Sequence, residues 1–435
     1  MEHNNTFNYE LLKSSLQAIV LHVSSIILSY IFMLLIAKHH GAEGIGIFAL
    51  TFTYISIGVI FSKLGLDIST MKYVSRLYKN QDERGIKNIY LTSLLFITIL
   101  SIVFSIIFYF LAYFFSVFIF SEEYLYTAFS IGAFIIIPMA LCQFHAEIIR
   151  SYQMIVSYFF IKNISHLLMC IILLYFGFTA NISNYVYLDI YLISHYLTLA
   201  IAFMFWIKKT NILNIKSKKS IATNLLFKSS LPIMLTSTII LIMGFIDIIM
   251  LGLLTTNQEV GIYNIALKFS SITSIALVAV NSIIAPKISQ LWDAKDMLNL
   301  QNIISSAAKI IFFISSPILI IYFIFPEDIL SIFGEEFILG STALIILSAG
   351  QFCNAITGPV GQVLNMTDNE NILRNTAFIS MIINVLLNYY LIPIYGISGA
   401  AISTAISSAF WNFLCVFVVY KKINIKTYFL PKLSK

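Results

Sequence analysis

Long apolar segments alternate with short charged connections along the whole chain, and this alternation constrains the fold more than any other feature. Crossing the roughly 30 Å hydrocarbon core of a bilayer takes roughly 20 apolar residues in a helix. The apolar runs are continuous and do not alternate with period two, which predicts helices instead of barrel strands. Only 11% of the residues are charged, against about 25% in soluble domains. The sequence therefore predicts an all-α integral membrane protein with twelve transmembrane helices, at about residues 15–37, 44–62, 89–119, 125–148, 155–177, 184–207, 229–253, 262–285, 307–326, 338–363, 372–393 and 396–420.

Basic residues are placed unevenly between these predicted helices. Every Lys and Arg except Lys38 and Lys268 lies at a terminus or near an even-numbered connection. Lysine and arginine in short loops resist translocation, so both termini are predicted to be cytoplasmic. The net charge of +6 is then a basic inner face, for which anionic membrane lipid is the expected partner and nucleic acid is not. The N-terminal 15 residues lack the basic region and small-residue cleavage site of a signal peptide.

The chain divides into two halves with weak internal similarity. A basic linker at 208–228 separates a predicted six-helix lobe at 1–207 from a second at 229–420, and a basic tail follows at 421–435. The segment GAEGIGIFALTF in the first half resembles NQEVGIYNIALKF in the second when Gly46 is aligned with Gly261. Repeated halves predict two pseudo-equivalent lobes with a cavity between them. Chance recurrence of glycine-aromatic turns in apolar sequence is the alternative.

Two charges lie at membrane depth near the junction of the seventh and eighth predicted helices. Asp247 is about six residues before the end of one helix, and Lys268 is about seven residues into the next. A charge at bilayer depth costs about 2.5–3.5 kcal/mol on insertion scales, so each requires a partner or a water-filled cavity. Asp247 and Lys268 are therefore predicted either to form an ion pair that locks this hairpin or to line a cavity that meets substrate or ion.

A second group of charges lies nearer the inner surface. Lys162 and Arg374 are close to the starts of the fifth and eleventh predicted helices, and Arg150 and Lys309 lie at similar depth. Long basic side chains near helix ends commonly extend to the lipid headgroups, which is the expected role of Lys309. Arg374 is the one basic residue of its connection, and cavity lining and contact with headgroups are both open for it.

No motif for catalysis or metal binding occurs in the sequence. There is no phosphate-binding loop, HExxH, paired carboxylate or Ser–His arrangement, and no connection is long enough to hold an enzyme site. The four cysteines lie in apolar segments without metal-ligand spacing, so helix packing is their expected role. Relay of protons and hydrogen-bonded packing are both open for the residues His22, His145, His166, His195 and Asp189. No enzyme activity, metal or cofactor is expected, apart from an undefined coupling ion, H⁺ or Na⁺.

Three stretches carry a resemblance to a known family. They are IAKHHGAEGIGIFALTFTYISIGVIFSKLGLDISTMKYVS at 36–75, DIIMLGLL followed by EVGIYNIALKFSS within 247–271, and NVLLNYYLIPIYGISGAAISTAIS at 384–407. Over essentially the whole chain the sequence resembles the polysaccharide-transporter branch of the MATE/MOP flippase superfamily, with the O-antigen flippases called Wzx as its nearest members. The resemblance implies two six-helix lobes in a V and a cationic central cavity. It departs from drug-exporting relatives because the N-terminal half shows no convincing acidic cluster.

The resemblance also implies a function in O-antigen or lipopolysaccharide biosynthesis. The expected substrate is a short oligosaccharide on undecaprenyl pyrophosphate, passed from the inner to the outer leaflet of the bacterial cytoplasmic membrane. A pyrophosphate favours arginine and lysine donors. The expected contacts are therefore Arg374, Lys162, Arg150 and Lys268, with Asp247 beside Lys268. Other polysaccharide-assembly membrane proteins are possible partners.

Two other functions compete with this interpretation. A multidrug or cation antiporter on the same fold would need carboxylates facing the cavity, for which Asp247, Asp189 and Glu147 are the candidates. A membrane polymerase or ligase would need a large outer loop, which the sequence lacks.

Overall fold

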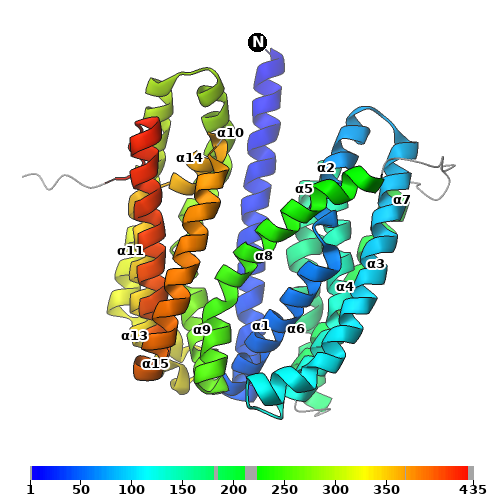
Figure 1. The fold of residues 1–435 in the computed structure, drawn as a ribbon, viewed down its shortest axis with the longest axis vertical. Coiled ribbons are helices and arrows are strands. Elements are labelled where there is room, and N and C mark those ends of the chain that lie inside the picture. Colours follow the sequence, from blue (N-terminus) through cyan, green and yellow to red (C-terminus); the bar gives the residue numbers. More distant parts are fainter. Residues whose placement is uncertain (1, 181–184, 211–222, 368, 430–435) are drawn as a thin grey trace, which may run out of the picture. The chain divides into compact units, whose positions relative to one another are not determined.

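The computed structural model describes the chain except residues 1, 181–184, 211–222, 368 and 430–435. The described residues form helices joined by short turns, with no β-strand among them (Figure 1). The longer helices are α1 (Glu2–Lys63), α2 (Leu66–Lys79), α3 (Glu83–Tyr113), α4 (Leu125–Ser151), α6 (Ser165–Ala180), α7 (Val186–Thr210), α8 (Thr223–Leu254), α9 (Asn257–Ile272), α10 (Ile275–Asp293), α11 (Met297–Ile324), α13 (Ser341–Thr357) and α15 (Glu370–Ile423). The shorter ones are η1 (Phe114–Ile119), α5 (Ile155–Phe159), η2 (Phe160–Ile164), α12 (Pro326–Ser331), η4 (Glu335–Gly340) and α14 (Val360–Met366).

The contacts divide the chain into two compact units. Unit 1 comprises Met1–His39 and Ile47–Phe245, and unit 2 comprises His40–Gly46 and Ile246–Lys435. The division falls inside α8, which runs from unit 1 into unit 2. The predicted linker at 208–228 and the basic tail at 421–435 lie partly outside the described residues, so these boundaries stay predictions.

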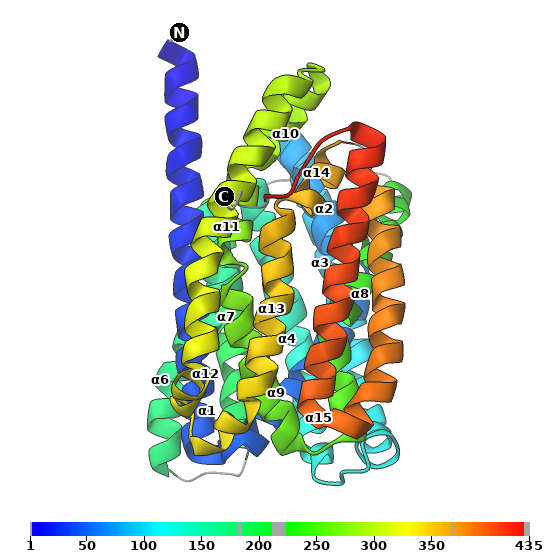
Figure 2. The same cartoon turned by 90° about the vertical axis from the view of Figure 1, so that its left-hand side faces the viewer.

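Within each unit, long helices pack side by side. In unit 1, α4 packs extensively against α3, α7 and α2, and α7 packs against α6. In unit 2, α13 packs against α15, α11 and α9, with α14 alongside α15 (Figures 1 and 2). α4 and α13 are therefore the central helices of their units, and side chains on α4 are well placed to meet several neighbours.

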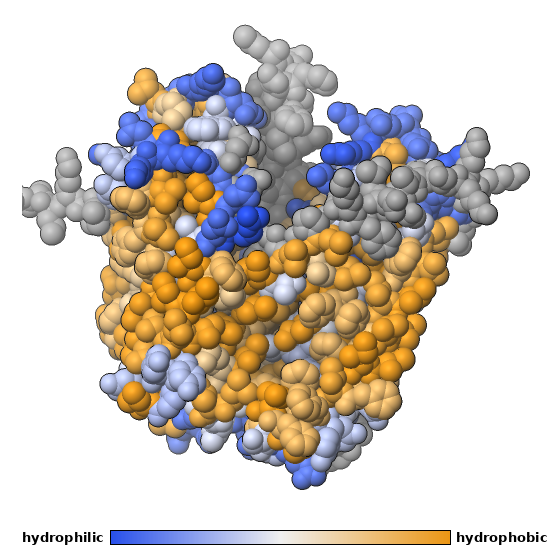
Figure 3. Space-filling model, viewed as in Figure 1, coloured by the Kyte–Doolittle hydropathy of each residue, from blue (hydrophilic) through white to orange (hydrophobic). Residues whose placement is uncertain are grey.

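The helices are those of a polytopic membrane protein. Among the described residues, nine helices are long and apolar enough to cross a membrane, or ten when α9 and the start of α10 count as one bent span. Figure 3 shows hydrophobic side chains covering the middle stretch of the visible face, with hydrophilic residues gathered towards the ends of the helices. The prediction of an all-helical integral membrane protein is confirmed, and the count of twelve crossings stays a prediction.

Two of these helices are long enough for more than one crossing. The apolar part of α1 has 44 residues and that of α15 has 53, or about 66 and 80 Å at 1.5 Å per residue. Each contains a glycine with non-helical backbone angles, Gly41 in α1 and Gly396 in α15, and the two parts of α15 run beside each other (Figure 2). A Cβ on Gly399 would lie 2.2 Å from the Leu391 carbonyl oxygen, so the α15 reversal requires a residue without a side chain.

Three predicted helices differ from the observed ones. The eighth, 262–285, is broken at Thr273 into α9 and α10, which bend by 46°. The tenth, 338–363, ends as a helix at Thr357, because Gly358 has a positive φ of 67° and Pro359 follows it. The fifth, 155–177, contains the five-residue π-helix η2, which includes Lys162. One-turn π segments inside α-helices occur frequently at functional sites.

The two glycines that the sequence comparison aligns are in contact. A Cβ on Gly46 would lie 1.8 Å from the carbonyl oxygen of Asn257, and a Cβ on Gly261 would lie 1.9 Å from that of Ala42. Each glycine thus faces the residue four positions before the other. At this crossing of α1 and α9, within unit 2, the backbones approach too closely for any side chain.

Candidate functional site

One face of α4 carries three polar side chains that lie close to other charged groups of unit 1. Gln143, Glu147 and Arg150 follow one another at spacings of four and three, so their side chains lie on the same side of the helix. The Glu147 side chain is 5% exposed, whereas that of Arg150, at the end of the helix, is 51% exposed. A carboxylate buried to this extent inside a membrane protein needs compensating charge or donors.

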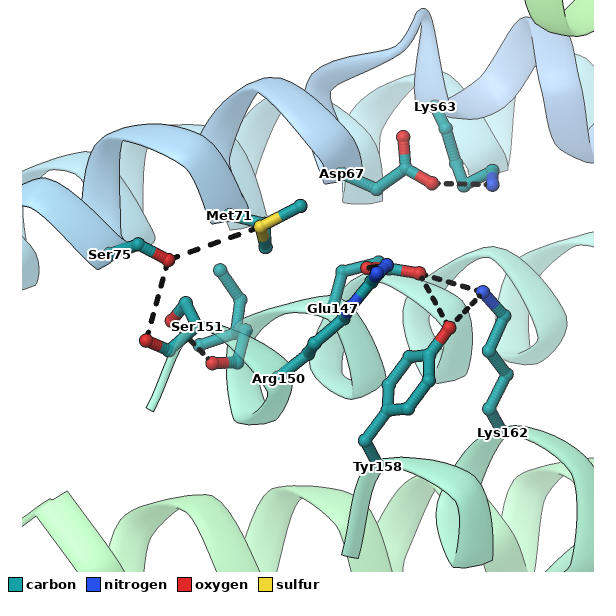
Figure 4. Close-up of polar contacts among 10 residues, drawn as sticks. Lys63, Asp67, Met71, Ser75, Glu147, Arg150, Ser151, Tyr158 and Lys162 are labelled. Atoms are coloured by element: carbon teal, nitrogen blue, oxygen red, sulfur yellow. Dashed lines mark hydrogen bonds and ion pairs between the residues drawn. The ribbon is translucent and has the colours of Figure 1, made fainter. Parts of the chain in front are cut away.

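Three side chains provide that compensation for Glu147. The Lys162 ammonium donates to its Oε1 at 2.7 Å, the Tyr158 hydroxyl donates to the same oxygen at 3.3 Å, and Arg150 donates to Oε2 at 3.3 Å (Figure 4). Lys162 also donates to the Tyr158 hydroxyl at 2.8 Å. The cationic groups of Arg150 and Lys162 lie 5.2 and 5.0 Å from the centre of the Tyr158 ring, within the range of cation–π attraction.

A second ion pair lies against the same helix. The Lys63 ammonium, at the end of α1, donates to Asp67 of α2 at 2.6 Å and to the Gln143 amide oxygen at 2.8 Å. The Lys63 and Asp67 side chains are 13% and 6% exposed. With the Glu147 group, this gives three cations and two carboxylates, a net charge of +1 along one face of α4.

A cavity of about 240 Å³ opens next to this charged group. Its walls come from α1, α4, η2, α6 and α7, all within unit 1. Lys162 belongs to both the cavity wall and the ion-pair group. The lining residues are Phe52, Met139, Cys142, Gln143, Ile161, Lys162, Asn163, His166, Tyr191, His195 and Thr198.

Unit 2 contains a separate buried polar group around Asp247. Asp247, 7% exposed, accepts hydrogen bonds from Tyr263 at 2.8 Å, from Asn388 at 2.7 Å and from Thr404. The Asn388 amide also donates to the Asn384 amide oxygen at 3.0 Å, while the Asn388 Oδ1 is buried with no hydrogen-bond partner. A carboxylate, an unpartnered amide oxygen and a hydroxyl together are oxygen ligands suited to a small hard cation.

This arrangement differs from the predicted Asp247–Lys268 ion pair. Asp247 accepts hydrogen bonds from three neutral side chains, those of Tyr263, Asn388 and Thr404. Asn388 and Thr404 approach Asp247 from α15, which the sequence analysis did not predict, and pairing of Asp247 with Lys268 stays a prediction. The proposed substrate roles of Asp247 and Lys268 stay predictions.

The other predicted contact residues fall in both units. Arg150 and Lys162 lie together in unit 1, whereas Arg374 is an exposed residue of α15 in unit 2. Among the described residues Arg374 makes no side-chain hydrogen bond or ion pair, so its role stays a prediction.

Three histidines of unit 1 differ in their contacts. Both ring nitrogens of His145 are hydrogen-bonded, Nδ1 to the Leu141 carbonyl at 2.8 Å and Nε2 to the Tyr90 hydroxyl at 3.1 Å. His166 and His195 face each other across 4.8 Å between ring centres, at the wall of the cavity. Across the described residues, no group of three His, Cys, Asp or Glu side chains is placed to hold a metal ion.

The sequence analysis did not predict that Glu147 is the central residue of this charged group. It was named as a candidate cavity carboxylate, and the expectation of no convincing acidic cluster in the N-terminal half overlooked that Asp67 and Glu147 are both buried there. Both are paired with lysine. The spacing of Glu147 and Arg150 was a readable signal, but the Lys162 partner depends on how η2 packs against α4.

Comparison with known proteins identifies the family and the fold. Residues 11–292, more than half of the chain, match the family described as polysaccharide biosynthesis protein, and residues 232–390 match the MatE family. The "probable low-salt glycan biosynthesis flippase Agl15" of Haloferax volcanii is 29% identical over 185 residues, which are 42% of this chain and 39% of that protein. The alignment thus spans about two fifths of the length of this relative.

Solved structures of membrane transporters resemble the whole chain. An inward-facing multidrug resistance MATE transporter of the MOP superfamily superposes with a TM-score of 0.74 at 14% identity, over 93% of this chain and 98% of that one. The lipid II flippase MurJ, in an inward closed conformation, superposes with a TM-score of 0.71 at 18% identity, over 92% and 86% of the two chains. The fold is therefore that of the MATE/MOP superfamily, whose matched members are transporters and flippases and not enzymes.

Proposed function

Because the chain belongs to the polysaccharide biosynthesis protein family, we propose that it is a flippase for a lipid-linked oligosaccharide. The substrate is a surface-polysaccharide repeat unit, such as an O-antigen unit, on undecaprenyl pyrophosphate. It moves from the inner to the outer leaflet of the bacterial cytoplasmic membrane, in which both termini of the protein face the cytoplasm. The lysine and arginine bias of the connections supports this orientation.

The observation that supports this function best is the group of cations around Glu147. Arg150 and Lys162 converge on one carboxylate from two helices, with Tyr158 between them. Two cations and a phenol at hydrogen-bond distance of one anion form a site that also suits phosphate oxygens. The entering pyrophosphate replaces the Glu147 carboxylate as the ion-pair partner of Lys162 and Arg150. Glu147 forms its ion pairs with both residues again when the lipid leaves.

Arg374 is assigned to the same step from the other half of the chain. Its guanidinium contacts phosphate oxygens in two places, whereas an ammonium acts as a point charge. Its exposed position and its lack of side-chain partners among the described residues support a role that begins when substrate arrives. Lys268 and Asp247 are assigned to a later step of transport, after the pyrophosphate has bound at Arg374 and Lys162.

The deciding experiment is deletion of the gene, followed by complementation. A flippase deletion loses surface polysaccharide and accumulates the lipid-linked unit in the inner leaflet, and the wild-type gene restores both. In this strain Arg374→Ala nearly abolishes polysaccharide, Arg374→Lys lowers it and Lys162→Arg is tolerated, at equal membrane protein levels. Unchanged polysaccharide in the deletion strain contradicts the proposal, and a fully active Arg374→Ala removes this residue from the site.

A cation or multidrug antiporter is the second candidate. It needs a carboxylate available to a cation. Asp67 and Glu147 are each paired with lysine, whereas the donors to Asp247 are neutral, so this candidate rests on Asp247. Drug sensitivity in the deletion strain, with normal polysaccharide, would support this candidate instead.

The coupling ion is assigned to Asp247. The unpartnered Asn388 oxygen beside the carboxylate is the observation that supports a bound Na⁺ there, in preference to a proton. Purified protein is then expected to melt at a higher temperature in NaCl than in choline chloride, and Asn388→Leu is expected to lose the difference. Equal melting temperatures in the two salts favour H⁺.

A further inference from the structure

The cavity in unit 1 is lined by polar side chains whose hydrogen-bonding capacity is largely unused. Thr198 is 1% exposed and its Oγ1 has no hydrogen-bond partner. Asn163 and His166 make no side-chain hydrogen bond with any described residue. His195 uses Nδ1 on the Tyr191 carbonyl at 2.9 Å, which leaves Nε2 available. Gln143 uses its amide oxygen on Lys63, which leaves its amide group as a donor.

Bonded and unbonded polar groups both occur on these helices, and the Thr51 and Ser130 hydroxyls, outside the cavity wall, are also buried without a partner. Elsewhere on the same helices, Ser194 donates to the Tyr191 carbonyl at 2.8 Å and His145 uses both ring nitrogens. Buried polar groups in folded proteins nearly always have partners, because an unpaired one has lost its hydrogen bonds to water without replacement. Here Thr198 and His195 are buried while Gln143, Asn163 and His166 are half-buried, and a ligand that brings both donors and acceptors would supply partners to all five.

The cavity dimensions and surface restrict that ligand to a small one. Its volume of about 240 Å³ lies below the roughly 300–1,000 Å³ of sites for drug-sized molecules. Its walls combine two aromatic rings, Phe52 and Tyr191, with two amides, two imidazoles and the aliphatic hydroxyl of Thr198. A pyranose ring presents hydroxyls, which donate and accept, and apolar C–H faces, which pack on aromatic rings.

We propose that this cavity is the binding subsite for one sugar ring, the ring attached directly to the pyrophosphate of the lipid-linked oligosaccharide. Lys162 supports the choice of ring, because it lies in the cavity wall and its ammonium is bonded to Glu147 at the proposed phosphate position. Gln143 and Glu147, one turn apart on α4, place the sugar and the phosphate on successive turns of one helix. This subsite rests on the proposed function and adds a preference for lipids that carry a sugar.

The test compares three lipids on the purified full-length protein in nanodiscs. They are undecaprenyl pyrophosphate, the same lipid with one N-acetylglucosamine, and the same lipid with one galactose, and native mass spectrometry gives each dissociation constant. The wild type is expected to bind at least one sugar-bearing lipid roughly tenfold more tightly than the bare lipid, which corresponds to about two neutral hydrogen bonds.

Thr198→Val removes the cavity hydroxyl and keeps the shape of the side chain. It is expected to reduce the sugar preference roughly two- to tenfold with no change in affinity for the bare lipid. Thr51→Val is the matched control, because the Thr51 Oγ1 is also buried and unpartnered in unit 1 but Thr51 does not line the cavity. Asn163→Leu gives a second, independent reduction if Thr198→Val is poorly folded.

The outcomes separate the subsite from the function. Equal binding of all three lipids to the wild type overturns the subsite and leaves the flippase proposal intact. The subsite is also overturned if Thr198→Val and Asn163→Leu keep the full sugar preference, as the control Thr51→Val is expected to do. The sugar is then bound elsewhere. Failure of all three lipids to bind overturns the flippase proposal and the subsite together.

Discussion

Replacing Glu147 with glutamine is expected to tighten binding of the lipid pyrophosphate. The carboxylate neutralises the cations that are assigned to the phosphate, at 2.7 Å from Lys162 and 3.3 Å from Arg150. Glutamine keeps the size of the side chain and its amide oxygen can still accept from Tyr158. The substitution therefore removes an internal competitor with little change of shape.

The magnitude follows from the distances and the exposure. A unit charge about 4 Å away is worth about 4 kcal/mol at an effective dielectric constant of about 20. The Lys162 and Arg150 side chains are 32% and 51% exposed, so solvent screening lowers this to about 1–2 kcal/mol. The dissociation constant of undecaprenyl pyrophosphate is then expected to fall roughly five- to thirtyfold.

The same change is expected to slow transport, because release of the lipid loses the competing carboxylate. Titration of nanodisc protein with undecaprenyl pyrophosphate measures the affinity, and surface polysaccharide in the complemented deletion strain measures transport. Glu123→Gln is the control, since it changes the net charge equally but lies just before α4, whose length of about 40 Å separates it from Arg150. Weaker or unchanged binding by Glu147→Gln would refute the reasoning and make the Glu147 group a structural ion pair.

Three further predictions concern topology, the Asp247 group and the glycine crossing. A reporter fused after Lys79 should be cytoplasmic and one fused after Glu123 outside, and the reverse result would contradict the charge-based orientation. Asp247→Asn should lower the free energy of unfolding by about 1–3 kcal/mol, because its amide nitrogen replaces either the oxygen that accepts from Tyr263 and Thr404 or the one that accepts from Asn388. An unchanged denaturation midpoint would argue against the observed hydrogen bonds. Gly261→Ala should destabilise by about 1–3 kcal/mol or more, since its Cβ would lie 1.9 Å from a carbonyl oxygen, whereas Gly244→Ala, with no atom within 4 Å, should be tolerated; equal melting temperatures for both variants would count against the close approach.

The helical fold was predictable because the bilayer acts on each segment by itself. A run of about 20 apolar residues must be a helix wherever it occurs in the chain, since its backbone groups have no other partners in hydrocarbon. The interruptions were less predictable. Pro359 marked a break in the tenth predicted helix, but the break after Ile272 has neither proline nor glycine beside it and depends on packing within unit 2.

The sequence predicted which types of residue form the candidate sites, but it did not predict which residues they contact. Asp247 was recognisable as a costly charge at membrane depth, yet two of its partners lie 141 and 157 positions along the chain. The sequence did contain a signal for one of these partners. Asn384 and Asn388 are four residues apart in an apolar helix, so they share one face. Two amides on one membrane-buried face require a polar neighbour, and Asp247 is that neighbour.

The aligned glycines show what an internal repeat can specify beyond the number of helices. Gly46 and Gly261 were matched because similar residues surround them, and the structure places each against the backbone four residues before the other. Because the two matched glycines contact each other's helices in the same way, the contact has local two-fold character. Both positions therefore need a residue without a side chain. Residues 40–46 pack within unit 2 although the chain on either side of them belongs to unit 1. The chain therefore passes between the units at 39–40 and 46–47 as well as at 245–246 inside α8, and the first two crossings lie next to the contact of Gly46 with Asn257.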